Sequence, residues 1–215
     1  MLGSRRRIRK TPGSGTLKLP EEPLWRPVAG AVGTRPPPPV AAWLHPASSL
    51  THRLRRTCGI GFTVRVLSQG WARPLPDEAL ALAIAPGRRA FVRRVQLLCN
   101  GVPWVFGRTV IPASTLRGRR RRLTHLGETP LGAVLFFDPS LRRESVDFAR
   151  ITLPCALFTD AGAGAANEVW ARRCRYRLEG RRLLVTEVFL PAISRAPPAE
   201  SLARRLGRHN GGHHD

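Results

Sequence analysis

Three charged side chains stand in β-rich segments where apolar residues are the rule: Arg93, Arg108 and Glu187. Charged groups on an apolar sheet face are uncommon unless they are paired or functional. Two arginines on one apolar face would suit a dianionic ligand, and a carboxylate on a nearby apolar face is a candidate for a functional group. The structural alternatives are arginines that reach the sheet edge or pair with an internal carboxylate, and an ion pair between Glu187 and Arg172.

A β-hairpin turning at Asn100-Gly101 is the element that would position the two arginines. Asn-Gly between β-rich runs favours a two-residue type I′ turn, in which both residues need a positive φ. An uninterrupted ladder then predicts four opposed pairs: Cys99 with Val102, Leu97 with Trp104, Val95 with Phe106, and Arg93 with Arg108. Both arginines would share one apolar face, provided that the register does not slip by one residue and invert every side chain.

A second hairpin, from Arg172 to Leu190, would position the carboxylate. With the turn at Glu179-Gly180, the ladder places Glu187 opposite Arg172. Glu187 shares its face with four apolar or aromatic residues: Tyr176, Leu183, Val185 and Phe189. The opposite face carries Arg173, Arg175 and Arg177, which we expect to lie in water.

Helices complete the expected domain. They are predicted near Trp43, after a serine N-cap before Leu50, from Asp77, and from Thr129-Pro130, where threonine caps the helix and proline occupies its first position. Main-chain N–H groups at Leu50 and Leu131 would lie at helix starts, which can bind an anion. A strand is predicted at residues 61–67, and residues 149–169 are predicted to form a loop. This pattern favours an α+β fold with an antiparallel sheet.

Composition sets the boundaries of the domain. Residues 1–40 are basic and rich in proline, residues 192–215 form a polar tail, and both are expected to be disordered around one domain at residues 41–191. The net charge of +22 includes +14 on that domain, and nearly all the cations are arginine, as GC-rich coding produces. We therefore expect no specific nucleic-acid binding, and we interpret the run Arg117 to Arg122 as a solvated loop. A basic nucleic-acid-binding protein remains an alternative.

Cysteine and histidine give no sign of a metal site. The four cysteines, Cys58, Cys99, Cys155 and Cys174, are widely spaced, so we expect four buried thiols in a reducing compartment. The histidines show no metal-ligand spacing. No apolar run is long enough to cross a bilayer, and no secretory signal is evident. We expect a cytoplasmic monomer that uses no metal and no cofactor.

Four motifs in collinear order resemble the bacterial chorismate lyase family. They are VRRV at 92–95, NGVPWVFGRTVIP at 100–112, LGETPLG at 126–132 and LLVTEVFLP at 183–191. The resemblance covers roughly residues 43–191. The chain departs from the family at Arg94, where glutamate is common, in the basic run at 117–122, in the length of the segment 149–169, and in both terminal extensions.

The resemblance implies a fold, an activity and a site. The fold it implies is an antiparallel β-sheet with flanking helices that encloses a ligand in an internal cavity. The family converts chorismate to 4-hydroxybenzoate and pyruvate, the entry step to the ubiquinone ring, without a cofactor. By motif position, Arg93 matches the arginine that binds a carboxylate, Glu187 the carboxylate that meets the ring hydroxyl, and Arg108 a second arginine lining the interior. Leu131 and Leu50 match residues that contribute main-chain groups. An alternative is a sensing module for aromatic carboxylates, since some transcription regulators use the same fold without turnover.

Overall fold

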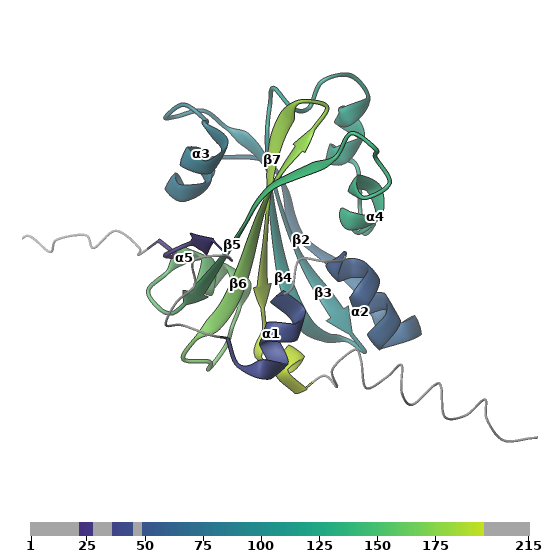
Figure 1. The fold of residues 1–215 in the computed structure, drawn as a ribbon, viewed down its shortest axis with the longest axis vertical. Helices are drawn as coiled ribbons and strands as arrows, with labels where there is room; N and C mark the ends of the chain where they lie inside the picture. Colours follow the sequence, from purple (N-terminus) through teal and green to yellow (C-terminus); the bar gives the residue numbers. More distant parts are fainter. Residues whose placement is uncertain (1–21, 28–35, 45–48, 196–215) are drawn as a thin grey trace, which may run out of the picture.

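Seven strands form one antiparallel sheet, and this confirms the predicted α+β architecture (Figure 1). The computed structural model describes residues 22–27, 36–44 and 49–195. Across the sheet the order is β1-β5-β6-β7-β4-β3-β2. The strands are β1 (Arg26–Pro27), β2 (Phe62–Ala72), β3 (Ala90–Cys99), β4 (Val102–Pro112), β5 (Arg142–Ile151), β6 (Val169–Leu178) and β7 (Arg181–Phe189).

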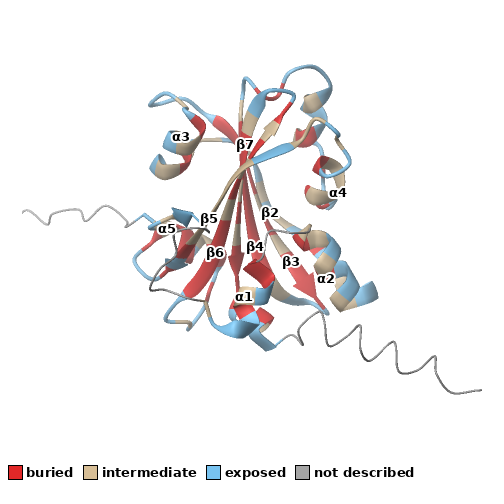
Figure 2. Cartoon of the chain, viewed as in Figure 1, coloured by how far each residue is buried: buried red, intermediate tan, exposed pale blue. Residues whose placement is uncertain are grey.

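Short helices cover both faces of the sheet (Figure 1). The α-helices are α1 (Pro38–Leu44), α2 (Leu50–Cys58), α3 (Pro76–Leu82), α4 (Gly132–Leu135) and α5 (Ala156–Ala161), and 3-10 segments span Gly59–Gly61, Gly118–Thr124 and Pro191–Arg195. Helices α1, α2 and α4 pack on one face, called here the α2 face. Helices α3 and α5 pack on the other, the α3 face. Burial is greatest along the central strands between these two helical layers (Figure 2).

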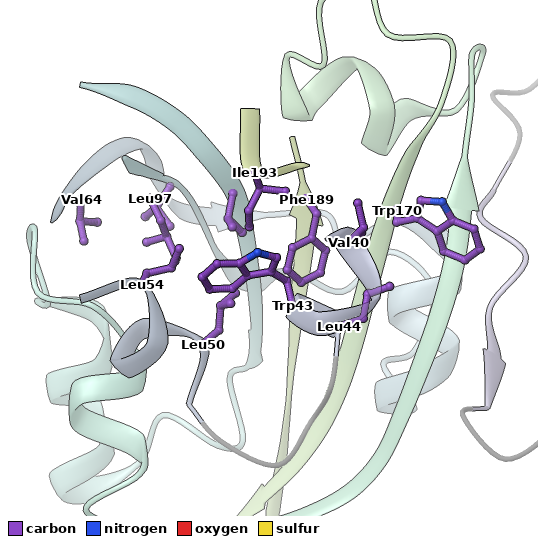
Figure 3. Close-up of a cluster of buried hydrophobic side chains, with 12 residues drawn as sticks. Val40, Trp43, Leu44, Leu50, Leu54, Val64, Leu97, Trp170, Phe189 and Ile193 are labelled. Carbon is purple, nitrogen blue, oxygen red and sulfur yellow. The ribbon is translucent and has the colours of Figure 1, made fainter. Parts of the chain in front are cut away.

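The α2 face carries two separate apolar clusters. One lies under α1 and α2 and is built around Trp43, Leu54 and Phe189 (Figure 3). The other lies under α4 and includes Leu135 and Leu183. The strand positions between the two clusters carry polar and charged side chains, and these positions form the candidate site described below.

The first hairpin turns where predicted but slips in register. Asn100 and Gly101 both have positive φ, 49° and 78°, and Cys99 pairs with Val102. Beyond the turn, the register shifts between Leu97 and Leu98. The observed pairs are Leu98 with Pro103, Leu97 with Val105, Val95 with Gly107, Arg94 with Arg108, and Arg93 with Thr109.

The predicted pairing of Arg93 with Arg108 is therefore wrong, and a β-bulge at Trp104 is the physical reason. An extra residue in one strand inverts the faces of everything beyond it. Trp104 packs edge-on against Trp43, with ring centroids 6.1 Å apart, and so joins the cluster under α1. The bulge leaves Arg93 on the α2 face and moves Arg108 to the α3 face.

The second hairpin follows the predicted register without interruption. Arg172 pairs with Glu187, Tyr176 with Leu183 and Leu178 with Arg181. The expectation that the arginines of the opposite face lie in water is wrong for Arg173, which is paired with Asp77 at 3.1 Å and Asp147 at 3.4 Å. Three further arginines of this face form ion pairs with Glu144: Arg175, Arg177 and Arg182.

Two local predictions on either side of β5 are wrong. The helix expected from Thr129-Pro130 is a single turn, α4, that begins at Gly132. The expected loop at 149–169 instead contains the end of β5, helix α5 and the start of β6. The strand β5 was not predicted, because its charged start, Arg142–Glu144, hides the alternation and β5 pairs with the distant β6.

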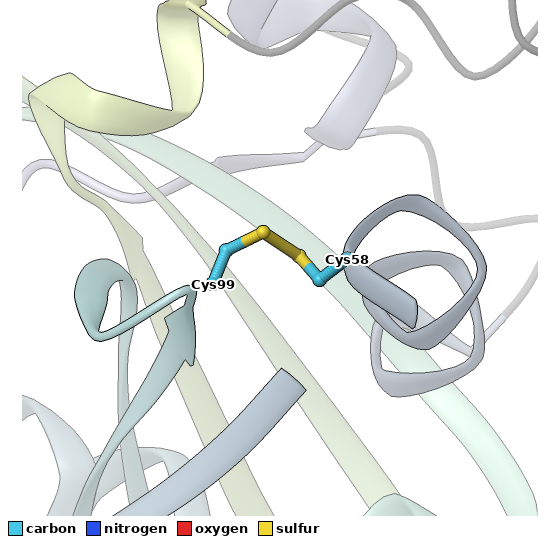
Figure 4. The surroundings of a disulfide bond; sticks show 2 residues. All are labelled: Cys58 and Cys99. Carbon is cyan, nitrogen blue, oxygen red and sulfur yellow. A yellow bond between two sulfur atoms is a disulfide. The ribbon is translucent and has the colours of Figure 1, made fainter. Parts of the chain in front are cut away.

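The expectation of four thiols is wrong for two cysteines. Cys58, at the end of α2, and Cys99, at the end of β3, form a disulfide across a sequence separation of 41 (Figure 4). Cys155 and Cys174 are free and buried, as predicted. The disulfide fastens the C-terminal end of α2 to the sheet.

The fold uses residues on both sides of the expected domain. Strand β1 pairs with β5, and the Trp25 indole N–H donates to Asp77 at 2.7 Å, so the sheet includes part of the N-terminal segment. Ile193 is fully buried in the cluster under α1. The rest of the predicted extension and tail, 1–21, 28–35 and 196–215, lies outside the described residues. No helix within the described ranges is long and apolar enough to span a membrane.

Candidate functional site

A pocket opens on the α2 face between its two apolar clusters. Strands β3, β4, β6 and β7 supply its floor, β5 contributes Arg143, and the start of α2 and the segment 130–136 form its walls. Four of the predicted site residues line it: Arg93, Glu187, Leu50 and Leu131. Their positions agree with the prediction, while their roles stay predictions.

Arg93 is a buried cation without a carboxylate partner among the described residues. The residue is 3% exposed. Its Nη2 donates to the main-chain carbonyls of Gly127 at 2.8 Å and Thr129 at 3.2 Å. Its Nε is buried and has no hydrogen-bond partner. Burial lowers the pKa of Arg93. An anion in the pocket would satisfy both the charge and the unused N–H group.

Glu187 and Arg172 form the ion pair that the sequence offered as an alternative. Nε and Nη2 of Arg172 both reach Oε2 of Glu187, at 2.7 Å and 2.6 Å, which leaves Oε1 outside the ion pair. Arg172 Nη1 also donates to the Leu44 carbonyl at 3.3 Å. Burial opposes the charge of Arg172, but Glu187 outweighs it and raises the pKa of the guanidinium. The pair fixes the position of the Glu187 carboxylate at the pocket wall.

The walls of the pocket come from two chain segments that approach closely. Ser49 caps α2 by accepting a hydrogen bond from the His52 main chain, which places Leu50 at the first position of the helix. A Cβ added to Gly132 would lie 3.1 Å from Thr51 Oγ1 and 3.3 Å from Ser49 Oγ. Glycine at 132 therefore allows α4 to approach the start of α2 beside the pocket.

Arg108 does not line the pocket, and that prediction is wrong. On the α3 face, its Nε and Nη2 donate to the two oxygens of Glu78, at 2.6 Å and 3.0 Å. Both side chains are almost fully buried, and Asp160 lies 3.5 Å from Nη1. Arg108 thus has the internal carboxylate partner that the sequence left open as an alternative.

Sequence reasoning missed two polar residues at the pocket, Arg143 and Tyr176. Arg143 was missed because β5 was missed. Tyr176 was assigned to the correct face but given no role. Burial raises the pKa of Tyr176, so its phenol stays protonated and can act as a donor. The Arg143 guanidinium carbon lies 5.8 Å from the centre of the Tyr176 ring.

Comparison with known proteins gives a consistent assignment. The family model described as chorismate lyase matches residues 19–196. A protein of Methylococcus capsulatus named probable chorismate pyruvate-lyase is 46% identical over 160 residues, which cover 73% of this chain and 97% of that protein. The chorismate pyruvate-lyase of Erwinia tasmaniensis is 38% identical over 162 residues, covering 75% and 82%.

Solved structures give a weaker match. A GntR-family transcriptional regulator from Bacillus cereus aligns with 61% of this chain and 93% of that chain, at 12% identity and a TM-score of 0.47, which is too low to bear on function. The family model extends across the pocket-lining strands. The chain therefore belongs to the chorismate lyase family.

Proposed function

We propose that this protein converts chorismate to 4-hydroxybenzoate and pyruvate, the step that supplies the ring of ubiquinone. The observation that carries the proposal is Arg93, a buried cation whose Nε has no hydrogen-bond partner among the described residues and which lines a pocket of mixed apolar and polar groups that includes Glu187. Such a pocket suits a ligand with a carboxylate on a flat, largely apolar ring. The family membership supports the same ligand.

Arg93 would bind the ring carboxylate together with the main-chain N–H of Leu131. Leu50 would complete this end of the pocket through its own main chain. Glu187 would accept a hydrogen bond from the C4 hydroxyl through Oε1, the oxygen not used by Arg172. Each hydrogen bond to a charged group contributes about 1.5–3 kcal/mol, so these contacts can fix the ring in one orientation.

The reaction needs little more than this orientation. The C3–O bond breaks and its electron pair stays on the enolpyruvyl oxygen, while C4 loses its proton and the C4–H electrons complete the aromatic ring. The proton ends on the methylene carbon of the departing enolpyruvate, which becomes pyruvate. Aromatisation drives the reaction, and a pre-organised site lowers the barrier through positioning and electrostatics.

We expect the proposed enzyme to be a cytoplasmic monomer that does not bind nucleic acids specifically. Internal ion pairs support the last point, because they hold Arg108, Arg172 and Arg173 away from a nucleic-acid ligand. In a reducing cytoplasm Cys58 and Cys99 would be adjacent thiols. Size-exclusion chromatography with light scattering tests this oligomeric state. The molar mass of a dimer at micromolar protein concentration would contradict it.

Chromatography of the products after incubation with chorismate tests the activity. We expect equal amounts of 4-hydroxybenzoate and pyruvate, and strong loss of both in Glu187→Gln. Removing the Glu187 carboxylate leaves Arg172 buried without its counter-charge, so we expect substitutions at Glu187 to lower the stability of the fold as well. A thermal melt of each variant must accompany the assay. If the protein binds 4-hydroxybenzoate tightly but does not cleave chorismate, the result would contradict the lyase proposal and favour a sensing module.

A further inference from the structure

The pocket contains three arginines that differ in what surrounds them. Arg172 is neutralised by Glu187 and bound to a main-chain carbonyl. Arg93 lies at the buried end with Nε unused. Arg143 lines the same pocket but is exposed, and it comes from β5, close to the edge of the sheet.

In the sheet, strand β7, which carries Glu187, lies between β3, which carries Arg93, and β5, which carries Arg143. The order is β3-β4-β7-β6-β5, and four strand spacings of about 4.8 Å amount to roughly 19 Å in a flat sheet. Along β7, Arg93 is level with Val185 and Arg143 with Leu183, so both arginines lie toward the same end of the strand from Glu187. Arg93 and Arg143 therefore line one pocket from two separate strands, on either side of β7.

Aromatic side chains line the pocket beside Arg143. Its guanidinium carbon lies 5.8 Å from the Tyr176 ring centre, and Tyr176 packs edge-on against Phe136 with centroids 6.1 Å apart. In the ladder, Arg143 pairs directly with Tyr176, so both side chains project from the α2 face. Arg143 is thus an exposed cation of the pocket lining that lies beside the Tyr176 ring.

Chorismate and 4-hydroxybenzoate differ at the position that Arg143 would contact. Chorismate has a second carboxylate, on the enolpyruvyl group at C3, next to the C4 hydroxyl assigned to Glu187. The product has only the ring carboxylate. Arg108 lies on the far face, whereas Arg143 lines the same pocket as Glu187 and Arg93, where it can meet the second carboxylate.

We propose that Arg143 binds the enolpyruvyl carboxylate and thereby distinguishes the dianionic substrate from the monoanionic product. This inference rests on the proposed lyase function. Arg143 contacts the carboxylate that leaves with pyruvate, whereas Arg93 contacts the ring carboxylate that substrate and product share. Substitution of Arg143 should therefore weaken the binding of chorismate alone, and substitution of Arg93 should weaken the binding of both ligands.

The test compares Arg143→Gln, Arg143→Lys and the matched control Arg150→Gln. Arg150 is also on β5, is exposed and pairs with Glu168 at 3.2 Å, so its substitution removes the same charge away from the pocket. In Arg143→Gln we expect KM for chorismate to rise about 10- to 100-fold, the worth of a charged hydrogen bond. The Kd of 4-hydroxybenzoate should change less than about twofold in the same protein. Arg143→Lys should recover part of the loss, and Arg150→Gln should match the wild type.

Two results would overturn the inference: an unchanged KM for chorismate in Arg143→Gln, or an equal weakening of both ligands. If the wild-type protein cleaves no chorismate, the proposed function fails on that result alone. The role of Arg143 is then judged from calorimetric Kd values for chorismate and 4-hydroxybenzoate in the same variants, with the same expected difference between the two ligands.

Discussion

Replacing Arg108 with methionine should destabilise the fold and leave ligand binding intact. Arg108 and Glu78 have side chains that are 6% and 3% exposed, and two hydrogen bonds join them. Removing one partner of a buried ion pair leaves an uncompensated charge and costs about 3–5 kcal/mol. Glu78 would keep only its contact with the Leu75 N–H, at 2.8 Å, while Asp160 would keep Arg94 at 3.0 Å.

Urea unfolding followed by tryptophan fluorescence measures this loss. With a slope of about 2.5 kcal/mol per molar urea, the midpoint should fall by about 1–2 M. The double variant Arg108→Met/Glu78→Leu should recover most of the stability, because replacing both partners of a buried pair with apolar groups is often neutral. The Kd of 4-hydroxybenzoate should stay within about twofold of the wild type, since both side chains lie on the α3 face.

The reasoning is refuted if Arg108→Met weakens 4-hydroxybenzoate binding tenfold or more at unchanged stability, because Arg108 would then contact the ligand. Strictly additive losses in the double variant would also contradict it. In that case the two side chains would not be coupled, and the register on which the face assignment rests would be in error.

Three further measurements test other parts of the structure. Arg93→Ala should weaken binding of both chorismate and 4-hydroxybenzoate by at least about tenfold, and an unchanged Kd by calorimetry would remove Arg93 from the site. Cys99→Ser should lower the free energy of unfolding by about 4 kcal/mol, the chain-entropy value for the separation of 41 residues; dithiothreitol should lower the wild type equally and leave the variant unaffected. Burial raises the pKa of the Cys174 thiol from 9.0 to about 11. The folded state therefore holds this proton more tightly than the unfolded chain, and stability that is complete below pH 9 should fall by up to about 3 kcal/mol as the pH rises to 11. Cys174→Ala should flatten this decline in urea titrations, and an identical slope in both proteins would contradict the assignment.

The two hairpins show what local sequence does and does not determine. Both turns were predicted correctly, because Asn-Gly and Glu-Gly meet the need for positive φ within two residues. The register of the second hairpin followed from its turn alone. In the first, Trp104 inserts as a bulge to pack on Trp43, a residue some sixty positions earlier. Hairpin pattern alone contains no sign of that contact.

The same limit explains the other missed elements. Strand β5 pairs only with distant strands, β6 and β1, and its first residues are charged because Glu144 meets three arginines from β6 and β7. The disulfide joins the end of a helix to the end of a hairpin, which Cys spacing does not indicate. In each case the residue that makes the contact is remote in sequence, so periodicity and local propensity do not predict the element.

The register slip also determines which arginines form internal ion pairs and which line the ligand pocket. Without the bulge, Arg93 and Arg108 would lie opposite each other on the pocket face, and Glu78 on α3 would have lost its partner. With it, Arg108 neutralises Glu78 on one face, and Arg172 neutralises Glu187 on the other. Arg93 and, by the inference above, Arg143 line the same pocket as Glu187 and would bind the carboxylates of a ligand. Two cations and a fixed carboxylate in one pocket match a ligand with two carboxylates and a hydroxyl group, which is the pattern of chorismate and not of its product.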